Sequence, residues 1–254
     1  MTTPPQTVLV LGDRGTLPFE ALHGEPLYVH GLRALVEAFP VEATITVDED
    51  HLTRVRSEVD DMGIGARVVT SSRWWDERAL LATHDLLVHD ALCPLTTAQF
   101  LRDVHERVAG RPGCSIMSFR PVTDTTKTVV AEQISGTFDR QRLAALMSPA
   151  VVPASLLAGA ISANRMPPFS DFGELATWLR GMGDLELVPA PSSALRVDDS
   201  SAVNLLECLD DVGRRVRVGP GERGRVTRGQ SSRPRGPSAP SPGAARPGTG
   251  PRET

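Results

Sequence analysis

The stretch Leu86-Leu87-Val88-His89-Asp90-Ala91-Leu92-Cys93-Pro94 joins a short apolar run to an acidic residue. A second stretch, Pro121-Val122-Thr123-Asp124-Thr125-Thr126-Lys127, contains an acid and ends in the only lysine of the chain. Short apolar runs that end at polar residues are typical of buried parallel strands. The two stretches therefore suggest the edge of an α/β sheet that handles a nucleotide.

The rest of the chain up to about residue 212 alternates between strand-like and helix-like segments. Strands are expected at 7–11, 43–47, 66–70, 86–89, 115–119, 185–189 and 195–197, a hairpin at 128–131 with 135–138, and helices at 27–39, 51–62, 96–109, 154–163, 172–182 and 201–212. This order predicts a doubly wound, mainly parallel α/β sheet. Such sheets bind ligands beyond the carboxyl ends of their strands, where Gly12, Asp90 and Asp124 fall.

Charge is unevenly distributed along the chain. From Gly219 to the end there are seven Arg and two Glu, although the whole chain has a formal net charge of −4. This last segment is rich in Pro, Gly, Ser and Arg, and Val226 is its only large aliphatic residue. It cannot bury enough apolar surface to offset its ordering entropy. We therefore expect a folded domain at 1–218 and a disordered tail at 219–254, which is either a solvated extension or a weak contact for nucleic acid or acidic lipid.

Cysteine usage and hydropathy exclude several classes of protein. Cys93, Cys114 and Cys208 are odd in number and widely spaced, so they indicate neither a disulfide framework nor a zinc site. The sequence contains no apolar run of about 18 residues, and its first residues lack the features of a secretion signal. We expect a soluble, cytoplasmic protein without a membrane partner.

A glycine-containing loop, Gly12-Asp13-Arg14-Gly15-Thr16, follows the first predicted strand and its last residue, Leu11. Glycines at such a position let backbone N–H groups approach phosphate oxygens. The same pattern also occurs in ordinary strand-to-helix turns. The loop is therefore a candidate phosphate site that needs support from other motifs.

Taken together, these motifs and the later Leu22-His23-Gly24-Glu25-Pro26-Leu27 resemble the 2-C-methyl-D-erythritol 4-phosphate cytidylyltransferases. The sequence is also similar to ribitol-phosphate cytidylyltransferases, and the resemblance covers about residues 7–212. It implies a Rossmann-like nucleotidyltransferase fold. It also implies transfer of CMP from CTP to methylerythritol phosphate, a step of isoprenoid synthesis that releases pyrophosphate.

The resemblance assigns roles on the nucleotide side of the site. Leu11, Gly12, Gly15 and Asp90 would bind the nucleotide, and the Asp90 carboxylate would hold Mg²⁺, a hard cation that takes oxygen ligands. Arg14 would partly replace a catalytic arginine of the family's loop, although Thr16 or Leu17 falls nearer the place where the family has that arginine. Without the resemblance, Asp90 is equally well explained as a strand-end residue that caps the following helix.

On the acceptor side the resemblance is more complete. Thr125 matches a threonine that contacts the sugar phosphate, and Arg140 matches an arginine that neutralises this phosphate and takes part in catalysis. Ser148 keeps a hydroxyl where the family usually has threonine. Arg196 keeps the positive charge of a phosphate-binding lysine. The implied ligands are thus CTP and a sugar-alcohol phosphate.

The sequence departs from the family where the nucleotide would bind. There is no lysine before residue 127, and Cys93 takes the place of an arginine. A thiol cannot supply the paired, charge-assisted hydrogen bonds of a guanidinium. The segment 71–78, with Trp74 and Trp75, replaces a glycine-rich stretch that holds cytosine. The two indoles would either stack on a base or pack against the edge of the sheet.

Two functions follow from this mixture. One is an active cytidylyltransferase, and the other is a catalytically impaired relative that binds phosphosugars or another protein. In either case the hairpin at 128–138 corresponds to an arm that the family extends across a two-fold axis, so we expect a homodimer. We expect the tail to be dispensable for stability and ligand binding.

Overall fold

The computed structural model describes residues 3–81, 83–122, 127–130, 133–137, 139 and 143–217, without the side chains at 79–80, 127–130, 133–137 and 212–217. The chain divides into two units, residues 1–217 and 218–254. The second unit contains the predicted tail, which lies outside the described residues. All that follows concerns the first unit.

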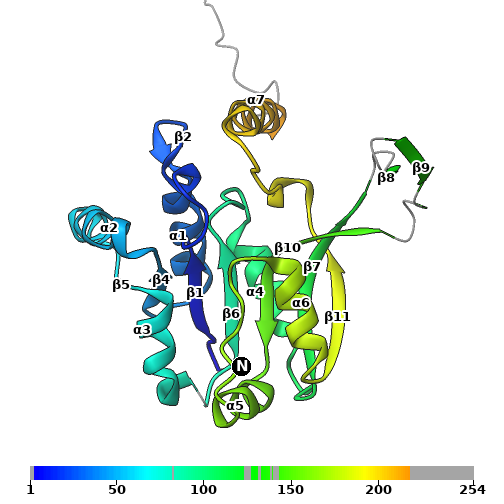
Figure 1. The fold of residues 1–254 in the computed structure, drawn as a ribbon. Coiled ribbons are helices and arrows are strands. Elements are labelled where there is room, and N and C mark those ends of the chain that lie inside the picture. The colour runs from blue at the N-terminus through cyan, green and yellow to red at the C-terminus, as the bar shows by residue number, and fades with distance from the viewer. Residues whose placement is uncertain are drawn as a thin grey trace, which may run out of the picture. The chain divides into compact units, whose positions relative to one another are not determined.

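A seven-stranded sheet forms the centre of this unit (Figure 1). Its order is β11-β7-β10-β6-β1-β4-β5, and β10 is antiparallel to both of its neighbours while the other pairs are parallel. The strands are β1 (Gln6–Val10), β4 (Ala43–Thr46), β5 (Ala66–Val69), β6 (Leu86–Asp90), β7 (Cys114–Pro121), β10 (Ala144–Val152) and β11 (Asp184–Pro189). The predicted fold class, a doubly wound and mainly parallel sheet, is confirmed.

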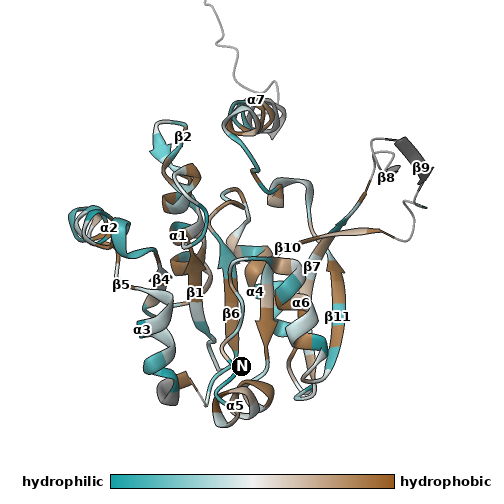
Figure 2. Ribbon diagram, viewed as in Figure 1, coloured by the Kyte–Doolittle hydropathy of each residue, from teal (hydrophilic) through white to brown (hydrophobic). Residues whose placement is uncertain are grey.

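Both faces of the sheet are covered by helices, which is why its central strands are apolar on both sides. Leu9 and Leu11 pack in one core, whereas Val8 and Val10 pack in the other. The first core is shared with α1 (Leu27–Ala38), α2 (Glu49–Met62) and α4 (Ala98–Glu106), and the second with α3 (Ser71–Asp76), α5 (Ala154–Ser162) and α6 (Phe172–Arg180). Figure 2 shows the contrast between apolar β1 and the largely polar α2 on the outside.

The two tryptophans belong to the second core. Trp74 and Trp75 are 1% and 6% exposed, and the Trp74 ring lies 5.1 Å from that of Phe169. Trp75 donates a hydrogen bond from Nε1 to Oδ1 of Asn164 at 3.2 Å. Of the two alternatives for these residues, the structure shows packing against the sheet.

Two segments differ from the predicted elements. The predicted strand at 195–197 is instead extended chain after a 3₁₀ turn, Ser192–Ala194, and Val197 donates its backbone N–H to the carbonyl of Leu92 at 2.8 Å. This segment therefore crosses the end of β6 and adds no strand to the sheet. Strand β10 was not predicted, because Pro149 interrupts its apolar pattern.

A small third core holds this crossing segment in place. It joins Leu22, Leu92 and Val197 to α7 (Ser200–Arg217), which covers the short hairpin of β2 (Ala21–Leu22) and β3 (Glu25–Pro26). The predicted hairpin is present as β8 (Lys127–Val130) and β9 (Gln133–Thr137), which pair with each other in a separate sheet. Among the described residues, no helix combines the length and apolarity that crossing a membrane requires.

Candidate functional site

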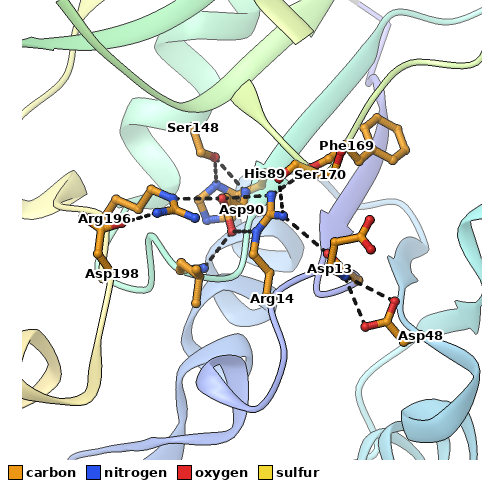
Figure 3. Close-up of polar contacts among 12 residues, drawn as sticks. Asp13, Arg14, Asp48, His89, Asp90, Ser148, Phe169, Ser170, Arg196 and Asp198 are labelled. Carbon is orange, nitrogen blue, oxygen red and sulfur yellow. Dashed lines mark hydrogen bonds and ion pairs between the residues drawn. The ribbon is translucent and has the colours of Figure 1, made fainter. Parts of the chain in front are cut away.

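Asp90, the last residue of β6, lies at the centre of a cluster of polar contacts (Figure 3). Its side chain is fully buried, and each carboxylate oxygen accepts two hydrogen bonds. Oδ1 accepts from Nε of Arg14 at 3.2 Å and from the backbone N–H of Leu92 at 3.0 Å. Oδ2 accepts from Nη2 of Arg14 at 3.2 Å and from Nε of Arg196 at 3.3 Å. The four acceptor positions of the carboxylate are thus all used.

All the hydrogen-bond donors of the Arg14 guanidinium are used, as are the acceptor positions of Asp90. This guanidinium has five N–H donors, of which two face Asp90. The other three donate to backbone carbonyls, those of Phe169 at 2.8 Å, Ser170 at 2.7 Å and Gly12 at 3.4 Å. The side chain is 2% exposed. Arg14 therefore ties the first loop and β6 to the segment before α6, and it has no donor left for a ligand.

Arg196 is the second cation on Asp90, and it faces solvent more openly. Nη1 is paired with Asp198, Nε is bonded to Asp90, and the side chain is 33% exposed. Burial works to lower the pKa of Arg196, but the neighbouring carboxylates of Asp90 and Asp198 outweigh it and raise the pKa. Its Nη2 has no partner among the residues that the structure describes. This guanidinium is charged and has donors available.

Ser148 lies behind Asp90, where its hydroxyl contacts the protein itself. Its hydroxyl accepts the backbone N–H of Asp90 at 2.9 Å and is bonded to Nδ1 of His89, and its exposure is 1%. His89 is fully buried, and burial lowers its pKa to about 4 despite the nearby charge of Asp90. These two residues fix the end of β6, and Ser148 is not among the residues that line the pocket described below.

At the start of the first loop, the backbone N–H groups of residues 11–13 are engaged. The N–H groups of Leu11 and Gly12 donate to the carbonyl of Thr46 at 2.8 and 3.1 Å. The N–H of Asp13, which has a positive φ of 60°, donates to both carboxylate oxygens of Asp48 at 3.2 Å. Figure 3 shows Asp48 pointing at this loop. A carboxylate thus takes the backbone donor that a phosphate would need.

A pocket of about 780 Å³ opens next to this cluster. It lies among the carboxyl end of β7, the start of β10, the N-terminus of α6 and the crossing segment at 195–198. Its charged lining residues are Arg14, Arg120, Asp171, Arg196 and Asp198. The guanidinium of Arg120 has no ion-pair partner among the described residues. With three cations, two acids and a helix N-terminus, the pocket favours an anion.

The structure therefore groups some of the predicted site residues and separates others. Leu11, Gly12, Arg14, Asp90 and Arg196 gather at the carboxyl end of the sheet, where Gly12 and Asp90 were expected. Ser148 is buried behind Asp90, and Gly15 has a φ of 58° with open space where a Cβ would be. Thr125 and Arg140 lie outside the described residues.

Arg120 was missed from the sequence. It stands in Phe119-Arg120-Pro121, at the end of a predicted strand and directly before the second motif. A cation at the carboxyl end of a strand in such a sheet is placed to meet a ligand. That position was the signal that could have identified it.

The Asp90 site does not fit the magnesium ion that the resemblance implies. Mg²⁺ requires oxygen ligands at 2.0–2.1 Å in a near-octahedral arrangement. Both oxygens of Asp90 are instead occupied by N–H donors, three of the four on cations. Cys93, where the family has an arginine, is fully buried, and burial raises the pKa of its thiol. It therefore contributes no charge to the site.

Comparisons with known proteins agree on one family. Residues 18–209 match the family model described as 2-C-methyl-D-erythritol 4-phosphate cytidylyltransferase. The fold is similar to that of such an enzyme from Thermus thermophilus, with 20% identity, a TM-score of 0.63, and coverage of 80% of this chain and 98% of that one. It is also similar to a 4-diphosphocytidyl-2C-methyl-D-erythritol synthase from Anaerococcus prevotii, with 12% identity, a TM-score of 0.62, and coverage of 82% and 96%. No curated protein matches the sequence.

Proposed function

We propose, from the premise that this chain belongs to the 2-C-methyl-D-erythritol 4-phosphate cytidylyltransferase family, that its pocket binds the phosphate of a sugar alcohol as the acceptor in cytidylyl transfer. Membership of the family makes the chain a nucleotidyltransferase of the cytidylyl-transferring class. The proposal adds the place of the acceptor and the residues that bind it. Methylerythritol phosphate is the acceptor that the family's name identifies.

The proposal rests on one observation, the two available guanidiniums in the pocket. Among the residues that the structure describes, Arg120 has no ion-pair partner and Nη2 of Arg196 has no hydrogen-bond partner. Both line the same pocket, beside the N-terminus of α6. A charge-assisted hydrogen bond contributes ~1.5–3 kcal/mol, so two such contacts are enough to place a phosphate. The hydroxyl groups of a sugar alcohol would fill the rest of the pocket.

In the proposed reaction, an oxygen of the acceptor phosphate attacks the α-phosphorus of CTP. A new P–O bond forms as the bond to the β-phosphate breaks, and pyrophosphate leaves. The chain's own groups position the acceptor and neutralise its charge, which are the main sources of rate in such a transfer. Arg120 and Arg196 would hold the acceptor phosphate, while Arg14 adds a fixed positive charge beneath it.

A second candidate, binding of a phosphosugar without transfer, is favoured by the nucleotide half of the site. There the Asp13 N–H is taken by Asp48, and Cys93 is neutral where the family has a cation. A triphosphate entering this loop would meet a carboxylate where it needs a donor. We therefore expect weak affinity for CTP, whereas the affinity for the acceptor should not be affected.

Pyrophosphate release distinguishes the two candidates. The full chain is incubated with CTP and methylerythritol phosphate, and coupled phosphate detection follows turnover. Turnover that needs both substrates and falls about tenfold or more in Arg120→Ala supports transfer, because removing one positioned cation commonly costs this much or more. Acceptor binding without any turnover supports the second candidate. Absence of both would exclude the proposed ligand.

We also propose that the chain forms a homodimer in the cytoplasm, as expected from the hairpin of β8 and β9. This hairpin pairs only with itself among the described residues, so it extends from the central sheet as an arm would. The position agrees with a role in completing a partner's acceptor site.

A further inference from the structure

The charge around Asp90 is already balanced by side chains of the protein. One buried carboxylate is paired with Arg14 and Arg196, and the second guanidinium is paired in turn with Asp198. Two cations thus face two anions within one connected network. A divalent ion placed at Asp90 would add two positive charges beside two guanidiniums, with no free carboxylate oxygen to bind it.

Hydrogen bonds also fix the position of the Arg14 guanidinium. Its five donors are matched by five acceptors, three of which are backbone carbonyls, one in the same loop and two in the distant segment before α6. Carbonyls of Phe169 and Ser170 cannot move away without shifting the segment that precedes α6. For a metal ion to reach Asp90, this whole arrangement would have to open. The guanidinium is therefore a permanent cation of the site.

We propose that the guanidinium of Arg14 stands in for a divalent metal ion at Asp90, so that the pocket binds its anionic ligand without a metal. Arg14 is a positioning residue in this account, because its donors are all used and only its charge reaches the pocket. It holds Asp90 and through Asp90 orients Arg196, which presents its remaining donor to the ligand. The part of this inference that concerns the ligand rests on the proposed function, whereas the exclusion of metal from Asp90 stands independently.

The first test measures metal binding directly. Mn²⁺, which takes the same oxygen ligands as Mg²⁺ and is visible by electron paramagnetic resonance, is titrated into the full chain and into Asp90→Asn, without nucleotide. We expect the signal of free Mn²⁺ to be the same in the presence of either protein. Saturable binding to the wild type that Asp90→Asn abolishes would overturn the proposal.

The second test uses calorimetry with methylerythritol phosphate, in EDTA and in MgCl₂ at matched ionic strength. Equal wild-type affinity in the two solutions supports the proposal, and affinity that requires Mg²⁺ overturns it. If the ligand fails to bind in both, the proposed function fails, and the Mn²⁺ titration still decides whether Asp90 binds metal.

A variant separates the charge of Arg14 from its structural contacts. Arg14→Gln keeps hydrogen-bond donors but removes the charge. We expect it to bind the ligand about tenfold more weakly in EDTA, because a fixed positive charge beside the pocket is lost, without the loss of a direct contact. Mg²⁺ should then restore part of the affinity, because the vacated place can take a cation. A loss that Mg²⁺ does not restore would contradict the exchange of guanidinium for metal. If Arg14→Gln does not fold, the two wild-type measurements decide the question alone.

Discussion

Arg14 and Asp90 form a buried ion pair with two hydrogen bonds, Nε to Oδ1 and Nη2 to Oδ2, both at 3.2 Å. The residues stand 76 positions apart, one in the loop after β1 and the other at the end of β6. Because β1 and β6 are parallel neighbours, their carboxyl ends meet at one edge of the sheet. The pair therefore depends on the topology of the sheet.

Removing Arg14 should destabilise the fold strongly. Arg14→Ala leaves the buried Asp90 carboxylate with one cation, and breaking such a pair from one side typically costs ~3–5 kcal/mol. We expect a loss at the lower end of this range in urea unfolding, because Arg196 remains. As a control, Arg33→Ala removes an exposed pair with Glu25 and should cost less than ~1 kcal/mol. Equal effects of the two substitutions would show that the buried pair has no special weight.

The stability of the fold should decrease as the pH is lowered, because of His89. Its pKa is about 4 in the folded protein and ~6.5 when unfolded. Below pH 6.5 the unfolded chain therefore takes up a proton that the folded chain does not, so stability is lost as the pH falls from 6.5 to 4. The loss at pH 5 is ~2 kcal/mol.

Unfolding curves at several pH values test this expectation. His89→Asn should remove most of the slope between pH 6.5 and pH 5, whereas His84→Asn, at a partly exposed position, should keep it. An unchanged slope in His89→Asn would assign the effect to other groups.

Asp48 should act as a barrier to nucleotide. Asp48→Ala frees the Asp13 N–H and removes a negative charge, so we expect affinity for inorganic triphosphate to rise about tenfold, the value of one charge-assisted contact. The side chain of Asp48 makes no capping bond to α2, so the helix should persist. Asp50→Ala changes the same charge on the same helix without contact to the loop. If calorimetry gives equal gains for both variants, only long-range charge is involved.

The arm hairpin should mediate dimerisation. Light scattering at micromolar concentration should give twice the monomer mass of 27.3 kDa, and deletion of residues 128–137 should shift the protein towards monomer. A monomeric wild-type chain would rule out this assembly.

Much of the fold could be predicted because its strands carry uniform apolar runs and its helices a clear period. The strand at β10 was missed because Pro149 breaks its pattern, and the strand expected at 195–197 was wrong because its apolar residues belong to a third core. Both cases depend on partners distant in sequence, which no local pattern records.

The site was predictable in its location but only partly in its contacts. Asp90 and Arg196 were singled out by family motifs. Asp90 lies where the sheet's topology places it, whereas Arg196 reaches the same end of the sheet from the crossing segment. That Asp90 would be saturated by Arg14, and that Ser148 would face the backbone of β6, follows from side-chain packing between segments distant in sequence. Arg120 was overlooked because a lone arginine has no motif of its own.

Calorimetry with methylerythritol phosphate tests the central claim, that Arg120 and Arg196 form the phosphate site, most directly. We expect the wild type to bind it more tightly than CTP, and Arg196→Ala and Arg120→Ala to weaken binding by about 10- to 100-fold each, the value of one charge-assisted contact. Arg107→Ala, which removes an exposed cation paired with Glu186 outside the pocket, should bind as the wild type does. Equal affinity in all four proteins, or tight binding of CTP alone, would contradict the account.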